Sequence, residues 1–284
     1  MKCIVIGDTG TGDKHQYDVA NGLTDIIKQE KIKFVLMAGD NFYDTGCSDH
    51  NDPQFISAFE KPYKNIPNDI KFYACLGNHC IYNESGKGHE AQFDYSRLSS
   101  DKNGKFVHPY HFYDFGKEKL FRVFVIDSNF DVLDDKFKKT QSRITCKKIR
   151  ESTEPWKILM LHTPITSIGE HGNLDDISFK YVKNIIKNGI DLVVSGHDHI
   201  GMLASVPINN KKVYQIISGN GGKPYFKSNK DKHIHPENVK KHKGELLHYN
   251  TDLGYTMLNI TPKNIDMTFL NKNNDKLFNH KISK

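Results

Sequence analysis

The sequence predicts an α/β fold in which two mixed β-sheets stack on each other and helices cover their outer faces. Three observations lead to this prediction. Short β-branched runs alternate with helical patterns in the first half, the same alternation resumes in the second half, and the last part has strands with no helices between them. Parallel strands need crossover helices, whereas consecutive strands pair antiparallel. We therefore expect a four-layer α/β/β/α sandwich in a single domain spanning residues 1–284.

The first half begins in βαβ order. A strand at 2–6 precedes a helix at 17–30, in which Val19, Leu23 and Ile26 have helical spacing. A second strand follows at 34–38. The remaining elements expected in this half are a helix at 54–63 and strands at 71–76, 111–115 and 120–126.

The second half repeats this order and then changes it. We expect helices at 134–150 and 178–187 and strands at 156–161 and 191–195. The final strands are expected at 213–218, 255–260 and 266–270. Residues 227–248 are polar and rich in Lys and His, which indicates a long surface loop. We expect this loop and residues 85–100 to form the substrate-specificity loops.

Composition limits the possible functions. The 40 Lys and Arg and 34 Asp and Glu residues give a formal charge of +6, which suits an anionic substrate. The lysines are spread along the chain, so we expect no nucleic-acid partner. No apolar run approaches 18 residues, so we expect a soluble protein without a membrane span.

The cysteines and the first residues bear on the compartment. Five cysteines occur without a C-x-x-C pair, which favours reduced, buried thiols over a thiolate zinc site or a disulfide framework. Residues 1–6 lack the pattern of a secretory signal. The protein is expected to be cytoplasmic if Met1 is its native start, and secreted or vesicular if a signal peptide was removed.

Polar clusters follow five of the expected strands. They are Gly7-Asp8, Gly39-Asp40 with Tyr43, Gly77-Asn78-His79, His162 alone, and Gly196-His197-Asp198-His199. Loops at the carboxyl ends of strands in an open α/β sheet converge on one crevice, so these clusters can meet. Glycine before the polar residue lets the backbone turn sharply and approach a ligand closely.

The clusters supply oxygen and imidazole donors and no thiolate, a set that suits iron, manganese and zinc. The candidate metal ligands are Asp8, Asp40, Tyr43, Asn78, His162, His197 and His199. Seven ligands are too many for one ion but natural for two ions that share a carboxylate. Two ions can stabilise both the attacking and the leaving oxygen of a displacement at phosphorus. The sequence therefore predicts phosphoester hydrolysis.

Each cluster also has a purely structural explanation. Gly-Asp-x-Gly alone is most often a tight turn, because turns use Gly and Asp. Five clusters in one chain, each at a strand end, favour the metal centre. A nucleotide-binding domain would need a phosphate loop such as G-x-x-x-x-G-K-[ST], which the sequence lacks.

In this order, GDTG, GDNFYDTG, GNH, a lone His and GHDH resemble the metallophosphoesterase superfamily. The variant with Tyr43 three residues after Asp40 is similar to the purple acid phosphatases, which include the tartrate-resistant type. The segments 162–172 and 218–222 also resemble that family, and the likeness extends from Ile4 to about residue 270.

The resemblance implies two metal ions and a role for each residue. Asp8, Tyr43 and His199 would bind a ferric ion (Fe3+), and the divalent partner would be Fe2+, Zn2+ or Mn2+. Asp40 would bridge the two ions. The ligands of the divalent ion would be Asn78, His162 and His197. His79 and His171 would be the catalytic residues that orient the phosphate and donate a proton to the leaving group.

The implied activity is that of an acid phosphatase, in which metal-bound hydroxide attacks a phosphomonoester in line. The substrate would be a small phosphate ester, with phosphoproteins and nucleotides as further candidates. One departure from the family is Cys80, which follows His79 where an acidic residue is usual. The other histidines, among them His108 and His111, are expected to be surface or loop residues.

Two alternatives remain open. The chain could be a phosphodiesterase or another metallophosphoesterase, although a serine/threonine protein phosphatase would have Gly-Asp-x-Val-Asp-Arg-Gly and Gly-Asn-His-Glu. It could also be a catalytically inactive scaffold that binds or anchors a partner. Inactive relatives lose metal ligands, and all seven are present here.

Overall fold

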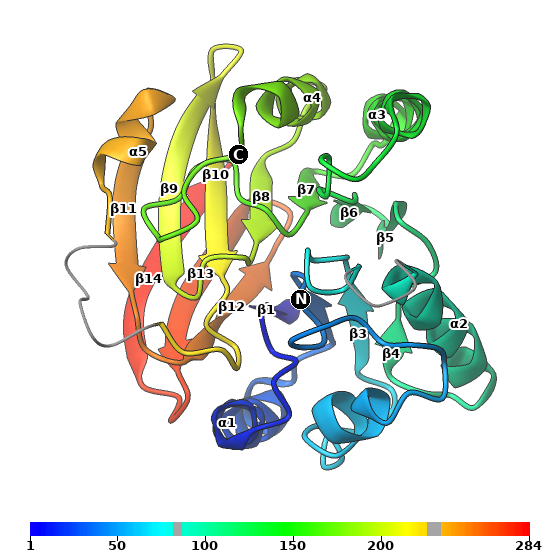
Figure 1. Cartoon of the computed structure of the whole chain (residues 1–284). Helices are drawn as coiled ribbons and strands as arrows, with labels where there is room; N and C mark the ends of the chain where they lie inside the picture. The colour runs from blue at the N-terminus through cyan, green and yellow to red at the C-terminus, as the bar shows by residue number, and fades with distance from the viewer. Residues whose placement is uncertain (82–86, 226–233) are drawn as a thin grey trace.

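Two seven-stranded β-sheets form the centre of the molecule in the computed structural model, which describes residues 1–81, 87–225 and 234–284 (Figure 1). The first sheet has the order β14-β13-β12-β1-β2-β3-β4, and the second has the order β11-β9-β10-β8-β7-β6-β5. The first sheet comprises β1 (Lys2–Ile6), β2 (Phe34–Met37), β3 (Lys71–Ala74), β4 (Phe106–Val107), β12 (Gly254–Ile260), β13 (Asn264–Asn271) and β14 (Lys276–Ser283). The second comprises β5 (Tyr113–Lys117), β6 (Phe121–Val125), β7 (Trp156–Met160), β8 (Leu192–Ser195), β9 (Gly201–Ile208), β10 (Lys211–Ser218) and β11 (Glu245–Asn250).

Both sheets are mixed. Strands β1 to β4 run parallel, as do β6, β7, β8 and β10, and the other pairings are antiparallel. The helices are α1 (Lys14–Glu30), α2 (Gly88–Asp101), α3 (Asp135–Glu151), α4 (Asp176–Ile186) and α5 (Glu237–Lys241), with one π-helical segment, η1 (Phe55–Glu60). Three of these helices begin after an aspartate whose carboxylate accepts backbone N–H groups, namely Asp13, Asp134 and Asp175. The cap at Asp13 explains why α1 begins three residues before the predicted helix.

Alternating side chains of the strands separate the layers. Ile4 and Ile6 pack with Leu23 of α1 on the outer face of the first sheet. Cys3 and Val5 point the other way, into a core shared with the second sheet. The outer face of the second sheet packs against α3 and α4. The layer order is therefore helices, sheet, sheet, helices, and the predicted four-layer α/β/β/α fold is confirmed.

The prediction of a loop was wrong for two segments. Residues 85–100 include most of helix α2, and residues 227–248 include α5 and the start of β11. Positions 82–86 and 226–233, which overlap those two segments, lie outside the described residues. Strands β9 and β14 were also missed. Pro207 weakens the strand pattern of β9. Strand β11 pairs only with residues 201–205 of β9, so at Pro207 the strand has a single neighbour, β10, and a proline is tolerated.

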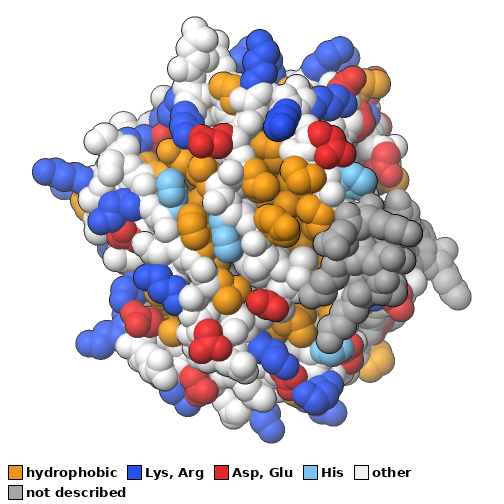
Figure 2. Space-filling model, turned by 90° about the vertical axis from the view of Figure 1, so that its left-hand side faces the viewer, with side chains coloured by type: hydrophobic (Ala, Val, Ile, Leu, Met, Phe, Trp, Pro, Cys, Tyr) orange, Lys and Arg blue, Asp and Glu red, His pale blue; other side chains and the backbone are white. Residues whose placement is uncertain are grey.

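The edge strands β11 and β14 lie on the same side of the sandwich, to the left in Figure 1. The rings of His248 and Phe278 connect them, with centroids 4.4 Å apart in a parallel stack. Figure 2 shows this side, where hydrophobic and histidine side chains gather in the middle and charged side chains surround them. Among the described residues, no helix is long and apolar enough to cross a membrane.

Candidate metal centre

The five polar clusters lie at the carboxyl ends of strands near the junction of the two sheets. Asp8 follows β1, Asp40 follows β2, and His197 follows β8. All three have the left-handed backbone conformation that non-glycine residues rarely adopt, with φ of 56°, 48° and 73°. Strained backbone of this kind persists only where the surroundings hold it, and it is concentrated at functional sites.

The glycines of these clusters make room for the neighbouring polar side chains. A Cβ atom on Gly77 would lie 2.1 Å from Oδ1 of Asp40, and one on Gly39 would lie 2.4 Å from Nδ1 of His162. Gly39 also has a φ of +91°. The sequence argument gave these glycines both a sharp turn and a close approach, and Gly39 shows both features.

One group of donors surrounds the phenolic oxygen of Tyr43. This oxygen lies 3.0 Å from Oδ1 of Asp8, 2.9 Å from Oδ2 of Asp40 and 3.3 Å from Nε2 of His199. The backbone N–H of His197 donates to the other oxygen of Asp8 at 2.9 Å. The hydroxyl has one hydrogen and can donate it to only one of these acceptors, so a proton or a cation is needed between the others.

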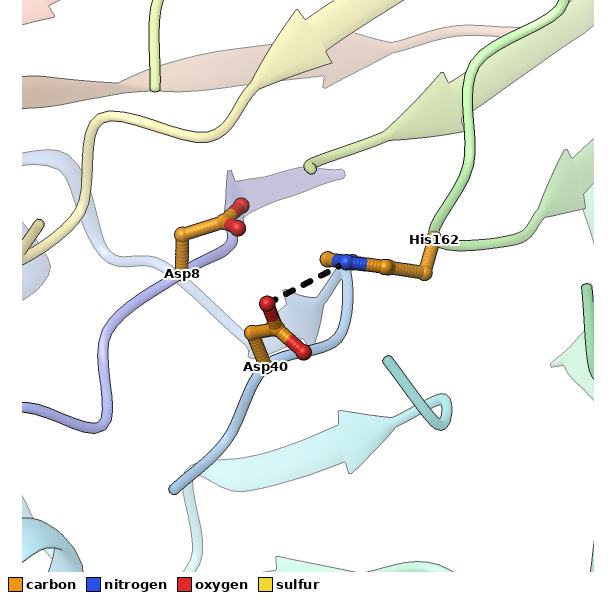
Figure 3. A group of neighbouring side chains, drawn as sticks. All are labelled: Asp8, Asp40 and His162. Carbon is orange, nitrogen blue, oxygen red and sulfur yellow. Dashed lines mark ion pairs between the residues drawn. The ribbon is translucent and has the colours of Figure 1, made fainter. Parts of the chain in front are cut away.

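A second group surrounds Nε2 of His162, which points toward Asp40 in Figure 3. This nitrogen lies 3.1 Å from Oδ1 of Asn78, 3.2 Å from Nδ1 of His197 and 3.4 Å from Oδ2 of Asp40. The other ring nitrogen of His162 donates to the carbonyl of Ala38 at 2.8 Å, which leaves a lone pair on Nε2 of the neutral ring.

Acceptor atoms therefore converge at two adjacent points, and Oδ2 of Asp40 belongs to both. Asp8, Asp40 and His162 are buried, and one ligand atom from each lies within 4.8 Å of the others. Buried acceptors are stable together only when a proton or metal ion lies between them. The donor set fits two cations that share a carboxylate.

The pKa shifts at the site follow from burial and from the charges that these groups exert on one another. Burial raises the pKa of Asp8 well above its usual range. Burial would do the same to Asp40, but the charge and hydrogen bond of His162, together with the charges of His79 and His197, outweigh it, and the pKa of Asp40 is lowered. The carboxylate of Asp40 in turn overcomes burial and raises the pKa of His162 to about 9.

The other two histidines among the candidate metal ligands, His197 and His199, stay neutral. Burial is the largest cause that lowers the pKa of His199 to about 3 and holds the pKa of His197 well below its usual value. A neutral imidazole is the form that binds a metal ion.

The two histidines expected to contact substrate border this set. The backbone N–H of His79 donates to Oδ1 of Asp40 at 3.0 Å, and the ring of His79 lies 4.7 Å from the ring of Tyr43. The exposed ring of His171 lies 4.4 Å from that of His197. Cys80, by contrast, is buried and accepts the N–H of Asn41 at 3.4 Å, so its thiol faces the interior.

Two residues near the site were missed at the sequence level. The buried carboxylate of Asp198 accepts the N–H of His171 at 2.9 Å and so fixes the loop that carries this histidine. The ammonium of Lys223 lies 4.7 Å from the centre of the Tyr43 ring. Asp198 could have been suspected from its place in Gly-His-Asp-His, whereas nothing in the pattern around Lys223 indicated that it reaches Tyr43.

Comparison with known proteins agrees with this geometry. The family model for calcineurin-like phosphoesterases matches residues 1–201. Purple acid phosphatase 3 of Arabidopsis thaliana is 26% identical over 94% of this chain and 73% of its own length. Human tartrate-resistant acid phosphatase type 5 is 23% identical over 99% of this chain and 90% of its own. The resemblance to purple acid phosphatases is thereby confirmed.

Solved structures share the fold. GAP50, the anchor in the inner membrane complex of Plasmodium, superposes with a TM-score of 0.80 at 20% identity, covering 100% of this chain and 88% of its own. A purple acid phosphatase from yellow lupin seeds gives a TM-score of 0.69 at 15% identity, covering 100% of this chain and 53% of its own.

Proposed function

Because this chain belongs to the calcineurin-like phosphoesterase family, we propose that it is a metal-dependent acid phosphatase that hydrolyses phosphate monoesters. Family membership supports phosphoester hydrolysis. The observation that carries the finer proposal is the position of Oδ2 of Asp40, 2.9 Å from the oxygen of Tyr43 and 3.4 Å from Nε2 of His162. One carboxylate oxygen thus belongs to two donor sets.

The two donor sets differ in chemistry. The set around Tyr43 contains a phenol and two carboxylates, which are hard anionic donors that suit Fe3+. The set around His162 contains two imidazoles and an amide, which suits a divalent ion such as Fe2+, Zn2+ or Mn2+. Two ions bound here would neutralise the phosphate charge and lower the pKa of a bound water. The ligands proposed for the pair are Asp8, Asp40, Tyr43, Asn78, His162, His197 and His199.

His79 and His171 are proposed to act on the substrate directly. Each borders the donor set from a different loop, and each is anchored through its backbone N–H by a carboxylate, from Asp40 and Asp198 respectively. An imidazole in such a position can orient the phosphate and deliver a proton to the leaving oxygen. The reaction proposed is a direct displacement by water without a covalent phosphoenzyme. Small phosphate esters are the proposed substrates, with phosphoproteins and nucleotides as further candidates.

The second candidate function is a non-catalytic anchoring or binding module. The high TM-score with GAP50, an anchor protein, motivates it, although that likeness concerns the fold. Retention of all seven donors in one network, with Asp8, Asp40 and His162 buried, favours the enzyme, since an inactive scaffold has no need of such a network.

Kinetics on protein loaded with iron and a divalent metal test the proposal. Hydrolysis of p-nitrophenyl phosphate between pH 4 and 8 is expected, and bis(p-nitrophenyl) phosphate should react more slowly. Preference for the diester would point to a phosphodiesterase. Two bound metals with no turnover of either substrate would favour the anchoring module.

A further inference from the structure

The segment that leads to Lys223 is fixed against the candidate metal centre by close backbone contacts. A Cβ atom on Gly221 would lie 2.6 Å from the carbonyl oxygen of Gly7, and one on Gly222 would lie 2.5 Å from that of Thr9. The N–H of Lys223 donates to the carbonyl of Asp8 at 3.0 Å. The backbone of Lys223 is therefore held in place beside the first candidate ligand.

The side chain of Lys223 extends over Tyr43. Its ammonium lies 4.7 Å from the centre of the Tyr43 ring and 3.1 Å from Oδ1 of Asp44. Tyr43 thus carries its phenolic oxygen in the donor set and presents its ring face to the ammonium. The ammonium of Lys223 therefore lies against a side chain whose oxygen belongs to the donor set.

The ion pair with Asp44 leaves Lys223 available to a ligand. The Asp44 side chain is 81% exposed and that of Lys223 is 30% exposed. Ion pairs with a largely exposed partner contribute little stability, so an anion that also binds at the metal site can displace Asp44.

We propose that Lys223 is a specificity-determining residue that binds a second anionic group, carried by the leaving group of the substrate directly beyond the scissile oxygen. This inference rests on the proposed phosphatase function and narrows its substrate class. The class comprises phosphoesters whose leaving group carries a carboxylate or phosphate one or two bonds from the ester oxygen. Because the ammonium lies against a proposed metal ligand, the anion that reaches it is expected to be close to the ester oxygen rather than at the end of a long leaving group.

Two substrates of similar size test the proposal. 2-Phosphoglycolate has a carboxylate next to the ester CH2, and ethyl phosphate has a methyl group in its place. The readout is the ratio of kcat/KM for the two substrates, which cancels any general effect on the metal centre. We expect Lys223→Met to lower this ratio about tenfold, because a hydrogen bond to a charged group is lost. Lys223→Arg should keep most of the ratio.

Lys212→Met is the matched control. Lys212 also pairs with a carboxylate, that of Glu245 at 3.0 Å, and lies 5.5 Å from a tyrosine ring, that of Tyr214. It belongs to β10, at the end of the strand opposite to the candidate metal centre. Its substitution should leave the ratio unchanged.

The outcomes separate this inference from the proposed function. An active protein whose ratio is the same in Lys223→Met and wild type overturns the inference and leaves the phosphatase intact. If the wild type turns over neither substrate, the phosphatase proposal fails, and calorimetric binding of the same two compounds to the metal-loaded protein decides the role of Lys223. The inference is supported if the wild type binds 2-phosphoglycolate more tightly than ethyl phosphate and Lys223→Met does not. It is overturned if the wild type and Lys223→Met bind 2-phosphoglycolate equally well.

Discussion

The phenolic oxygen of Tyr43 lies 2.9 Å from Oδ2 of Asp40 although the two side chains are three residues apart in a loop. Asp40 has a φ of 48°, so the chain turns back at that point and brings the phenol over the carboxylate.

This relationship predicts a coloured protein. In protein loaded with iron, Tyr43 should bind as a phenolate and give a visible charge-transfer band. Tyr43→Phe should lose the band because no other tyrosine reaches the donor set in the described part of the chain. The absorption spectrum measures this, and Tyr110→Phe, at an exposed position, is the control. A band that persists in Tyr43→Phe would exclude Tyr43 as a ligand.

Asp40→Asn tests whether one carboxylate serves two ions. Loss of its charge should reduce bound metal below two ions per chain and lower kcat/KM by at least about a hundredfold. That is the upper end of the loss seen when only a group that hydrogen-bonds to a metal ligand is removed. Elemental analysis and kinetics on the same sample measure both. Asp94→Asn on the exposed face of α2 should match the wild type. Full metal content in Asp40→Asn would contradict the shared-ligand arrangement.

Substitutions of His79 and His171 should depend on the leaving group. A general acid contributes roughly a hundredfold or more when the leaving oxygen needs a proton. We therefore expect His79→Ala or His171→Ala to lower kcat strongly with ethyl phosphate and less with p-nitrophenyl phosphate, whose leaving group departs unprotonated. His15→Ala, at an exposed position of α1, is the control. Equal losses with both substrates would assign these histidines to binding alone.

His108 corrects one expectation and gives a prediction for acid stability. It was expected at the surface, yet it is fully buried, and neither ring nitrogen has a hydrogen-bond partner among the described residues. Burial lowers its pKa from 6.5 to about 3. Between these values the unfolded chain binds a proton that the folded chain excludes, so the free energy of unfolding falls as the pH falls below about 6.5.

His108→Phe should remove this loss. The difference in free energy of unfolding between pH 7 and pH 5 should shrink by about 2 kcal/mol in the variant. Urea denaturation at the two pH values measures it, with His15→Phe as the control. An unchanged pH dependence would show that His108 is protonated in the folded protein.

The sequence by itself determined the layer order and the residues that the strand ends carry. Short apolar runs such as residues 2–6 and helical spacing within 17–30 are local patterns, and burial in the structure follows them. The prediction that five strand-end clusters converge needed only the rule that parallel strands present their carboxyl ends at one edge. The metal-ligand and catalytic roles of these residues remain predictions.

Tertiary structure alone decided which partners each residue has. The division of the donors between Tyr43 and His162 depends on strands from both sheets, and no local pattern encodes distances across that junction. Contacts between residues far apart in the chain bury His108. Such contacts also connect Asp198 with the His171 loop and place Lys223 over Tyr43. Strand β14 also lacked a clear pattern, because most of its side chains are partly or fully exposed and only Ile282 is buried.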